Sequence, residues 1–455
     1  KQSGSTLTLG GSGTAVTLAA GATQSGFGRS GSVNWQTTPK TATFTAANGE
    51  GYFINSGSAL TMNLPAGSAG AIVAVSDYAR NFATHNFTIS ANGSEKIGGV
   101  AADLTLSVNG QSTTLVYVDS TKGWINVQNA EDTATGQTFI CASVSGTGNT
   151  LATAPCCSNV KIATFTGPGT FTVNSISTTA DDNIVSHLVV AGGGGGGSGI
   201  GGGGGAGGFR EVKSPSATGY TASPLDGYPT APNRVTLTAA AFPITVGAGG
   251  AGGPSGGNTG TSGGVSTFST VTSAGGGGGA GTSDAHVAGG SGGGAAYNAL
   301  ISPTGAPGGA GNTPPVSPPQ GNPGGTGSNP VGAGNPPGPP CAATTSTGGG
   351  GATAAGGNWD SARPAAGAGG AGATTNISAS PVAYAGGGGG SFNTSGAPGP
   401  GGAGGGGAGA PGPAGAGAAA GNGTANLGGG GGSSGDPVQA GSGGSGIVII
   451  RYKFQ

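Results

Sequence analysis

Charge is scarce in this sequence. Its 455 residues include 13 lysines and arginines, 14 aspartates and glutamates and 3 histidines, and charged residues make up only 6%. The cations are spread along the chain and form no basic run. Nucleic-acid binding depends on lysine and arginine side chains that neutralise a track of phosphates. The composition therefore argues against nucleic acid as a partner.

Long apolar runs are also missing. No apolar stretch approaches the roughly 20 residues that span a bilayer, and the first residues lack the pattern of a signal peptide. We therefore expect no membrane insertion. The chain begins at Lys1, and Met62 is its one methionine. This indicates a processed product or a chain without its N-terminal segment, which in a fibre would hold the attachment to the particle.

Cysteine is rare. The four cysteines are Cys141, Cys156, Cys157 and Cys341. None forms a metal-type Cys-x-x-Cys pair, and two adjacent cysteines are poorly placed to chelate one zinc ion. We interpret them as small buried residues of a linker, with a disulfide between chains as the alternative. No metal site is expected.

Patterns typical of catalysis are absent as well. The carboxylate pairs Asp181-Asp182 and Glu131-Asp132 are adjacent in sequence. Neighbouring side chains of an extended chain point to opposite faces, so such pairs make poor acid–base couples. Matches to Gly-x-Gly-x-x-Gly carry no information without a strand–turn–helix context. We expect no catalytic residue, no cofactor and no enzymatic activity.

Glycine is what the chain has in abundance, with 110 glycines and 29 prolines. Such a composition without a repeat ordinarily indicates disorder. Disordered chains, however, combine high charge with low hydrophobicity, whereas 34% of these residues are hydrophobic. Ordering glycine costs more backbone entropy than ordering any other residue. We therefore interpret the glycine as part of a regular architecture that offsets this cost.

The N-terminal third is typical of β structure. Residues 1–30 alternate small and β-branched residues, which predicts a repetitive β stem that needs neighbouring chains. Residues 31–130 predict an all-β module with Asn48-Gly49 and Asn109-Gly110 as hairpin turns, and its aromatic residues are expected in the core rather than stacked on a ligand. The predicted strands are Ala42–Ala46, Gly51–Ile54, Leu60–Leu64, Ala71–Val75, Asn86–Ser90, Leu104–Val108, Thr113–Val118 and Trp124–Val127.

Two strands are predicted to frame the glycine-rich region. Residues 131–160 have few large apolar side chains and are predicted as a linker, followed by a hairpin at Gly167-Pro168-Gly169. Strand Ile184–Val190 then runs into polyglycine, and polyglycine ends at strand Ile447–Ile450. Because domain termini often lie close together, we expect residues 161–455 to form one domain.

Polyglycine has few ways to become ordered. An α-helix costs about 0.8–1.0 kcal/mol per glycine relative to alanine, and a glycine sheet has no side chains to pack. The remaining option is an extended helix with three residues per turn, whose N–H and C=O groups pair with neighbouring helices. The predicted fold is therefore all-β with a sandwich of polyglycine type II helices and little or no α-helix. Loops at the ends of this rigid scaffold are the natural place for recognition.

The order of these motifs resembles the glycine-rich domain of bacteriophage tail-fibre proteins and the adhesin tips of T4-like phages. In the adhesin tips, polyglycine type II helices present receptor-binding loops. The first module is similar to β modules in structural proteins of marine phages, cyanophages especially. The motifs are Leu188–Ala191 before Gly192–Gly197, Gly205–Arg210, Ile244–Gly250, Ser266–Phe268 before Gly275–Gly279, and Gly443–Tyr452 in the glycine-rich region, and Gly51–Asn55, Val75–Ala79 and Leu115–Trp124 in the first module. The proline-rich insertion Pro314–Pro340 departs from the adhesin pattern, so no receptor contacts are carried over.

Large side chains stand out against the glycine background. Tyrosine, tryptophan and arginine carry a disproportionate share of interface energy, although packing against the glycine layer is the alternative role for each one. The clearest candidates for exposed contacts are Trp359, Asp360 and Arg363, which lie close together in sequence. The other candidates are Tyr220, Tyr228, Tyr297 and Phe392.

These observations and the resemblance imply a bacteriophage fibre protein, either a tail fibre or a fibre tip. Such a protein would lie outside the virion and bind a host cell-surface protein or glycan. Its other expected partners are further copies of itself, in a homotrimer, and a baseplate, tail or capsid protein. The alternative is a purely structural fibre or capsid-decorating protein without a dedicated receptor.

Overall fold

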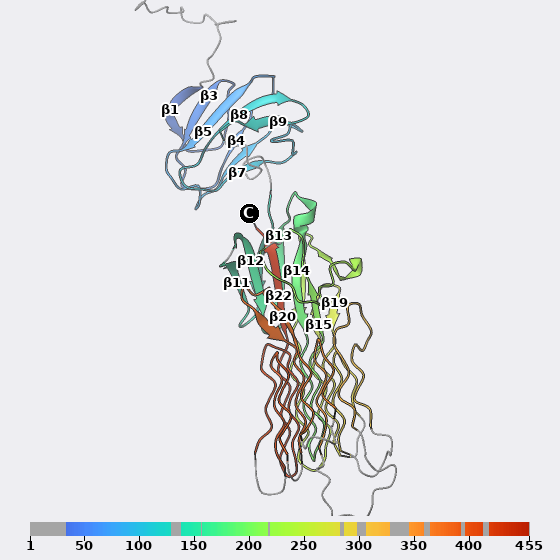
Figure 1. The fold of residues 1–455 in the computed structure, drawn as a ribbon. Helices are drawn as coiled ribbons and strands as arrows, with labels where there is room; N and C mark the ends of the chain where they lie inside the picture. Colours follow the sequence, from blue (N-terminus) through green and yellow to red (C-terminus); the bar gives the residue numbers. More distant parts are fainter. Residues whose placement is uncertain are drawn as a thin grey trace, which may run out of the picture. The chain divides into compact units, whose positions relative to one another are not determined.

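The computed structural model describes residues 33–128, 138–155, 157–216, 219–282, 286–297, 306–327, 345–358, 365–392, 396–412 and 418–454. The described residues contain strands and two short 3-10 helices but no α-helix, which confirms the predicted all-β class. The chain divides into two compact units, Lys1–Gln137 and Thr138–Gln455 (Figure 1). The predicted β stem, residues 1–30, lies outside the described residues.

The first unit consists of two sheets with a shared core. One sheet has the order β1-β3-β5-β8-β9 and the other β2-β4-β6-β7. In the first sheet β1, β3 and β5 are parallel, and in the second β2, β4 and β6 are parallel. The chain therefore alternates between the sheets from β1 to β6. The strands are β1 (Asn34–Lys40), β2 (Phe44–Thr45), β3 (Glu50–Ile54), β4 (Leu60–Asn63), β5 (Ile72–Asp77), β6 (Phe87–Ser90), β7 (Leu104–Leu106), β8 (Ser112–Asp119) and β9 (Gly123–Asn126).

The Asn-Gly turns of this unit are present, but they are not hairpins. Gly49 and Gly110 have positive φ values of 87° and 80°. A type I′ hairpin requires positive φ at both central residues, and neither asparagine has it. Each turn joins strands of different sheets, so the hairpin prediction was wrong. The aromatic residues Phe82, Phe87 and Trp124 lie in the core, as predicted.

The second unit contains a pair of sheets at the base of the glycine region. Their orders are β10-β13-β17-β18-β19 and β11-β12-β22-β14-β15, with β16 also pairing with β14 and a separate hairpin β20–β21. The 3-10 helices are η2 (Ala180–Asn183) and η3 (Ala231–Asn233). The strands are β10 (Cys141–Ser145), β11 (Thr150–Ala154), β12 (Cys157–Phe165), β13 (Gly169–Ser175), β14 (Ile184–Val190), β15 (Phe209–Val212), β16 (Val235–Thr236), β17 (Ala241–Thr245), β18 (Ser266–Phe268), β19 (Val271–Ser273), β20 (Ala373–Thr375), β21 (Val382–Tyr384) and β22 (Ile447–Lys453).

Two predictions for the start of this unit need correction. Residues 131–160 are not only a linker, because β10 and β11 belong to the sheets of the second unit. Their small residues gave no strong apolar signal, yet Ile140 and Ala154 are each only 2% exposed. Gly167-Pro168-Gly169 does not close a hairpin either, since β12 and β13 lie in different sheets.

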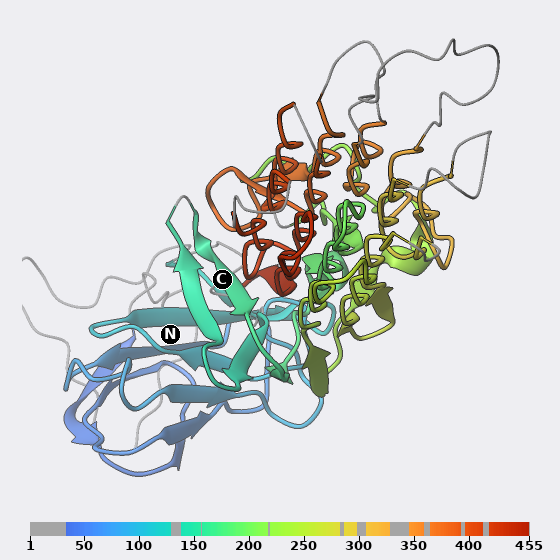
Figure 2. The same ribbon diagram turned by 90° about the horizontal axis from the view of Figure 1, so that it is seen from below.

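The strands that frame the glycine region are neighbours in one sheet. β14 and β22 pair antiparallel, with Ser186 opposite Arg451 and Val190 opposite Ile447. Both strands are almost entirely buried. The glycine region is therefore inserted between two adjacent strands of one sheet, and it extends from them as a set of rods lying side by side (Figures 1 and 2).

The rods are joined by backbone hydrogen bonds with a period of three residues. In segment 192–197, residues three apart donate their N–H groups to the same neighbouring segment, over N···O distances of 2.9–3.0 Å. The carbonyl groups of the same residues accept from three other segments, again with a three-residue period. In order along 192–197, the acceptors are Gly264, Gly444, Gly205, Thr261, Gly441 and Gly202, and the donors are Gly276, Gly250, Gly431, Gly279, Gly253 and Ser434.

Glycine is required in this arrangement because the neighbouring backbones fill the space of a Cβ atom. A methyl group on Gly195 would overlap the carbonyl of Ala251, and one on Gly430 would overlap the carbonyl of Gly204. Each Cα therefore faces a carbonyl oxygen, an approach that also permits weak Cα–H···O contacts. Collagen requires glycine at its crowded axis for the same steric reason.

The sequence of each rod reflects its position in this assembly, which we call the glycine bundle (the extended segments between residues 191 and 446). Segment 192–197 is enclosed and contains only glycine. Segment 247–253 lies at the surface, and every third residue, Ala248 and Ala251, is exposed. Segment 258–264 is at an outer edge, with glycine at every third position, Gly260 and Gly263, facing the bundle.

Candidate functional site

The two ends of the glycine bundle differ in what they carry. At the near end the rods continue into β14, β15 and β22, which hold them in place (Figure 1). At the far end the chain reverses in tight turns. One of these places Gly199 and Ile200 at positive φ values of 67° and 66°, and Gly197 donates to the carbonyl of Gly202 across it at 2.9 Å.

The far end also brings together segments that are distant in sequence. Ile200 donates to the carbonyl of Ser434, and Tyr297 donates to the carbonyl of Ile200. Isolated β-bridges at this end join Ala306 to Gly327, Thr345 to Phe392, Ala365 to Ala397 and Phe392 to Pro411. The residues that flank each undescribed stretch between positions 282 and 418 lie at this end. Rods are also connected at the near end, for example by the β18–β19 hairpin and by the turn at Gly404 and Gly405. The far end therefore carries one of two sets of connections on a rigid scaffold.

Two of the predicted contact residues lie at this far end. Phe392 is only 7% exposed and is bridged to both Thr345 and Pro411. Tyr297 is half-buried. Trp359, Asp360 and Arg363 lie outside the described residues, so their prediction remains open. For Phe392 the structure shows the packing role that was the alternative.

Tyr220 and Tyr228 lie in the β-sheet part of the second unit, and the structure does not bring them together with the far end. Tyr220 is 7% exposed, and the guanidinium of Arg451 lies 5.1 Å from the centre of its ring. Tyr228 is half-buried beneath Arg234, at 4.3 Å. Burial leaves Tyr220 little surface for a partner, which corrects its prediction as a contact residue. Both tyrosines therefore have an arginine side chain packed over the ring.

A recess at the far end was not predicted from the sequence. Its lining includes Thr282, His286, Ala295, Ala296 and Ala306. Apart from His286, these are small residues of the kind that fill the glycine region everywhere, so their sequence carried no signal. The recess combines methyl groups with one hydroxyl and one imidazole.

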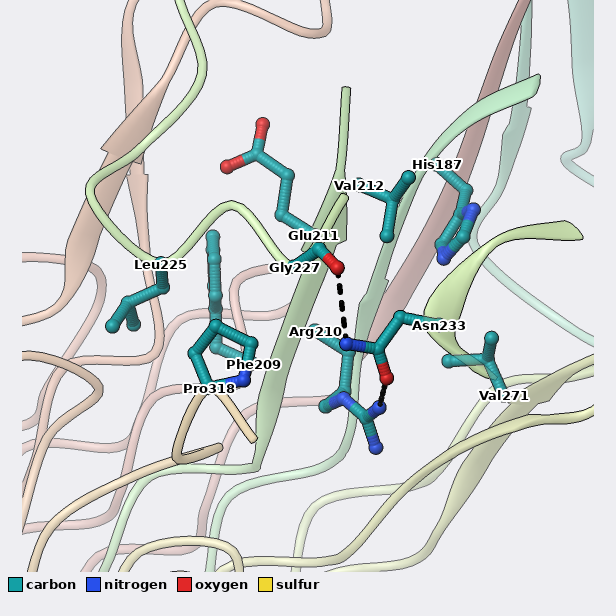
Figure 3. A pocket seen from close by; sticks show the side chains of 10 residues that line it. All are labelled: His187, Phe209, Arg210, Glu211, Val212, Leu225, Gly227, Asn233, Val271 and Pro318. Carbon is teal, nitrogen blue, oxygen red and sulfur yellow. Dashed lines mark hydrogen bonds between the residues drawn. The ribbon is translucent and has the colours of Figure 1, made fainter. Parts of the chain in front are cut away.

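A second, narrow pocket lies beside β14 and β15 and is shown in Figure 3. Arg210 donates to Asn233 Oδ1 at 2.6 Å, and Asn233 Nδ2 donates to the carbonyl of Gly227 at 3.1 Å. Burial, with a smaller contribution from the nearby Arg210 guanidinium, lowers the pKa of His187 to about 3. A neutral imidazole and an engaged guanidinium indicate a structural cavity that fixes the loop around Gly227.

Glu211 is the most deeply buried carboxylate near this cavity, at 2% exposed. It accepts hydrogen bonds from the Ser223 N–H, at 2.8 Å, and from the Thr375 hydroxyl. Burial raises its pKa, and these hydrogen bonds oppose that shift. Figure 3 shows its carboxylate pointing away from Arg210. The side chain thus ties β15 to the loop before Asp226 and to the β20–β21 hairpin.

Within the described ranges, no group of three or more histidine, cysteine, aspartate or glutamate side chains is placed to hold a metal ion. In the same ranges, no helix has the length and hydropathy needed to cross a membrane.

Two β-sheets that frame hydrogen-bonded glycine rods define a glycine-rich structural domain. The chain belongs to the glycine-rich domain family, whose sequence profile matches residues 164–453. No curated protein matches this chain. The match begins within β12 and ends at the last residue of β22, so it covers the frame as well as the rods.

Proposed function

We propose that this protein is a bacteriophage fibre protein, a tail fibre or fibre tip, that binds the host cell surface through the far end of its glycine bundle. The rods are polyglycine type II helices in this proposal, and the receptor is a cell-surface protein or glycan. The protein acts without enzymatic activity as an external part of the virion. It assembles with other copies of itself, in a homotrimer, and with a baseplate, tail or capsid protein.

One observation carries the proposal. At the far end, away from the sheets, turns and isolated bridges connect rods of a scaffold that is held by backbone hydrogen bonds. Loops on a rigid scaffold can change in sequence and length without affecting the residues that position them. In the glycine bundle the loops and the scaffold are independent in sequence, because the scaffold depends on backbone atoms and not on side chains. Such a design suits a protein whose target varies.

A binding assay on cells tests the proposal. Labelled full-length protein is titrated onto a panel of marine bacterial strains that includes cyanobacteria. We expect saturable binding to at least one strain and a loss of binding in the double variant Trp359→Ala and Arg363→Ala. The matched control is Lys122→Ala with Val127→Ala, which removes a cation and an exposed apolar side chain from the first unit.

The competing hypothesis is a structural fibre or capsid-decorating protein without a receptor. It is supported if no strain shows saturable binding while antibodies against the second unit still decorate a virion. Release of oligosaccharides from a glycan substrate by the full-length protein would contradict the non-enzymatic part of the proposal. Native mass spectrometry of the full chain tests the trimer, and a monomer or dimer would contradict it.

A further inference from the structure

A strip of aromatic side chains lies on the outward face of the first unit's larger sheet. It contains Trp35 of β1, Phe53 of β3 and Tyr78, which directly follows β5. These strands are neighbours in the sheet (Figure 1). The ring centres of Trp35 and Phe53 are 4.9 Å apart, and those of Phe53 and Tyr78 are 6.4 Å apart. Trp35 is 39% and Tyr78 is 60% exposed, so the strip is open to solvent.

The strip is distinct from the core on the other side of the same strands. Tyr52 and Ile54 of β3 are buried in that core, and alternation along the strand places Phe53 on the opposite face. The other aromatic residues of the first unit's core are nearly inaccessible, with Phe82, Phe87 and Trp124 at 1% exposed or less. Core packing therefore does not account for the position of this strip.

A glycine holds the indole ring in a particular orientation. Trp35 is paired with Gly51 on the neighbouring strand. A Cβ atom on Gly51 would lie 2.8 Å from two carbon atoms of the indole ring. The ring therefore lies against the backbone of β3 at a position where any other residue would lift it. The indole is 39% exposed, and the ring of Phe53 stacks on it.

The strands next to the strip present uncharged side chains on this face, and the exposed Arg80 follows Tyr78 by two residues. The outward positions of β3, β5 and β8 carry aromatic, aliphatic, glycine and hydroxyl residues and no charged side chain. They are Gly51, Phe53, Ile72, Ala74, Ser76, Ser112, Thr114, Val116 and Val118. Asn55, the next outward residue after Phe53, is also exposed. An anionic ligand would require lysine or arginine side chains here, so the face is complementary to an uncharged ligand with hydrogen-bonding groups.

We propose that the strip formed by Trp35, Phe53 and Tyr78 binds a neutral glycan. A sugar ring has a face of C–H groups, whose positive edge charge is attracted to the negative face of an aromatic ring. Its rim of hydroxyl groups can pair with serine, threonine and asparagine side chains. Rigid aromatic side chains also give a large contact area at low entropic cost. This site is separate from the far end of the glycine bundle and does not depend on the function proposed for that end.

The experiment uses full-length protein on an array of immobilised neutral, sialylated and sulfated glycans. We expect binding to neutral glycans and a loss of about tenfold or more in Trp35→Ala, comparable to the loss when one stacked base loses its aromatic partner. The variant Gly51→Ala keeps the indole but fills the space in which the ring lies, and we expect it to weaken binding as well. Gly57→Ala is the matched control, because a methyl group there meets nothing within 4 Å.

Four results would overturn the proposal. They are the absence of neutral-glycan binding by folded protein, binding that Trp35→Ala leaves unchanged, a preference for the sialylated or sulfated glycans, and a self-association that Trp35→Ala abolishes. The last result, measured by light scattering, would assign the strip to a second copy of the chain. Hydrogen exchange of the first unit shows whether each variant is folded. If a variant is not folded, Tyr78→Ala is tested in its place. The variant Trp359→Ala with Arg363→Ala should retain full glycan binding, which separates this test from that of the far end.

Discussion

The interiors of the two units are stabilised by different interactions. The first unit encloses large apolar side chains between two sheets, and burial of apolar area, at roughly 25 cal/mol per Å², is its main source of stability. The glycine bundle has almost no side chains to bury. Its interior consists of backbone groups that donate and accept along segment 192–197 without a gap.

The comparison shows what each interior tolerates. A side-chain core can relax around a changed residue because rotamers can adjust, at some cost. A backbone core cannot, since each Cα faces a carbonyl of the next rod. Each backbone hydrogen bond contributes only about 0.5–1.5 kcal/mol net, and each ordered residue costs about 1–2 kcal/mol of backbone entropy. The bundle must therefore satisfy nearly all of its bonds to be stable.

The largest expected effect is the removal of a ring from the side-chain core. Phe87 is 1% exposed and stacks on Phe82 with ring centres 5.2 Å apart. Phe87→Ala should destabilise the first unit by about 3–5 kcal/mol and leave the second unit unchanged. Urea unfolding followed by hydrogen exchange, read separately for peptides of each unit, measures both. Equal losses in the two units would show that they do not unfold independently.

The reverse experiment adds one methyl group to the backbone core. Gly195→Ala forces a Cβ against the carbonyl of Ala251, and we expect the second unit to lose about 3 kcal/mol, the upper range for overpacking. Gly167→Ala is the control in the same unit, because its nearest neighbour would be 3.7 Å away. Urea midpoints of the two variants give the comparison. Similar midpoints would contradict a steric requirement for glycine in the rods.

The smallest effect concerns pH. The unfolded chain protonates His187 near pH 6.5, whereas the folded chain does so only near 3, so the second unit should lose stability as the pH falls through this range. Glu211 acts in the opposite sense, because its raised pKa adds stability that is lost as the pH rises through its folded value. Between pH 6.5 and 4 we expect a net loss of about 2–3 kcal/mol.

His187→Phe provides the check on this pH effect, since it removes the titrating group and keeps an aromatic ring against Phe268, whose ring centre lies 5.7 Å away. The slope of stability against pH should flatten in this variant, whatever its absolute stability. The groups that also act on the measured slope include Arg210 and Glu211, which line the same cavity. An unchanged slope would mean that His187 does not cause the pH dependence of stability.

Much of the fold could be predicted from local patterns. Alternation located β3, β4 and β8, and the apolar runs Ile184–Val190 and Ile447–Ile450 predicted the frame of the glycine region. Strand partners were harder, because a turn such as Asn48-Gly49 fixes a local reversal but not the sheet in which the next strand lies. The short strands β10 and β11 were missed because small residues such as Ala142 and Ser143 give no periodic signal.

The sequence also predicted the candidate sites only in part. Large side chains in a glycine background are conspicuous, but conspicuous residues can serve as packing, as Tyr220 and Phe392 do. The recess at the far end is built from alanines, so nothing in the sequence distinguishes it. Trp35 was grouped with the core aromatics, and only the pairing of β1 with β3 shows that it lies on Gly51.

The adjacency of β14 and β22 has a consequence for how such proteins can diversify. Because the whole bundle leaves and rejoins one sheet at neighbouring strands, the separation of its two attachment points is set by the sheet spacing of about 4.8 Å. A bundle with other rods or other connections could replace this one by recombination at those two strands. The sheet that contains β14 and β22 would then stay constant, while the glycine region inserted between them would be exchanged.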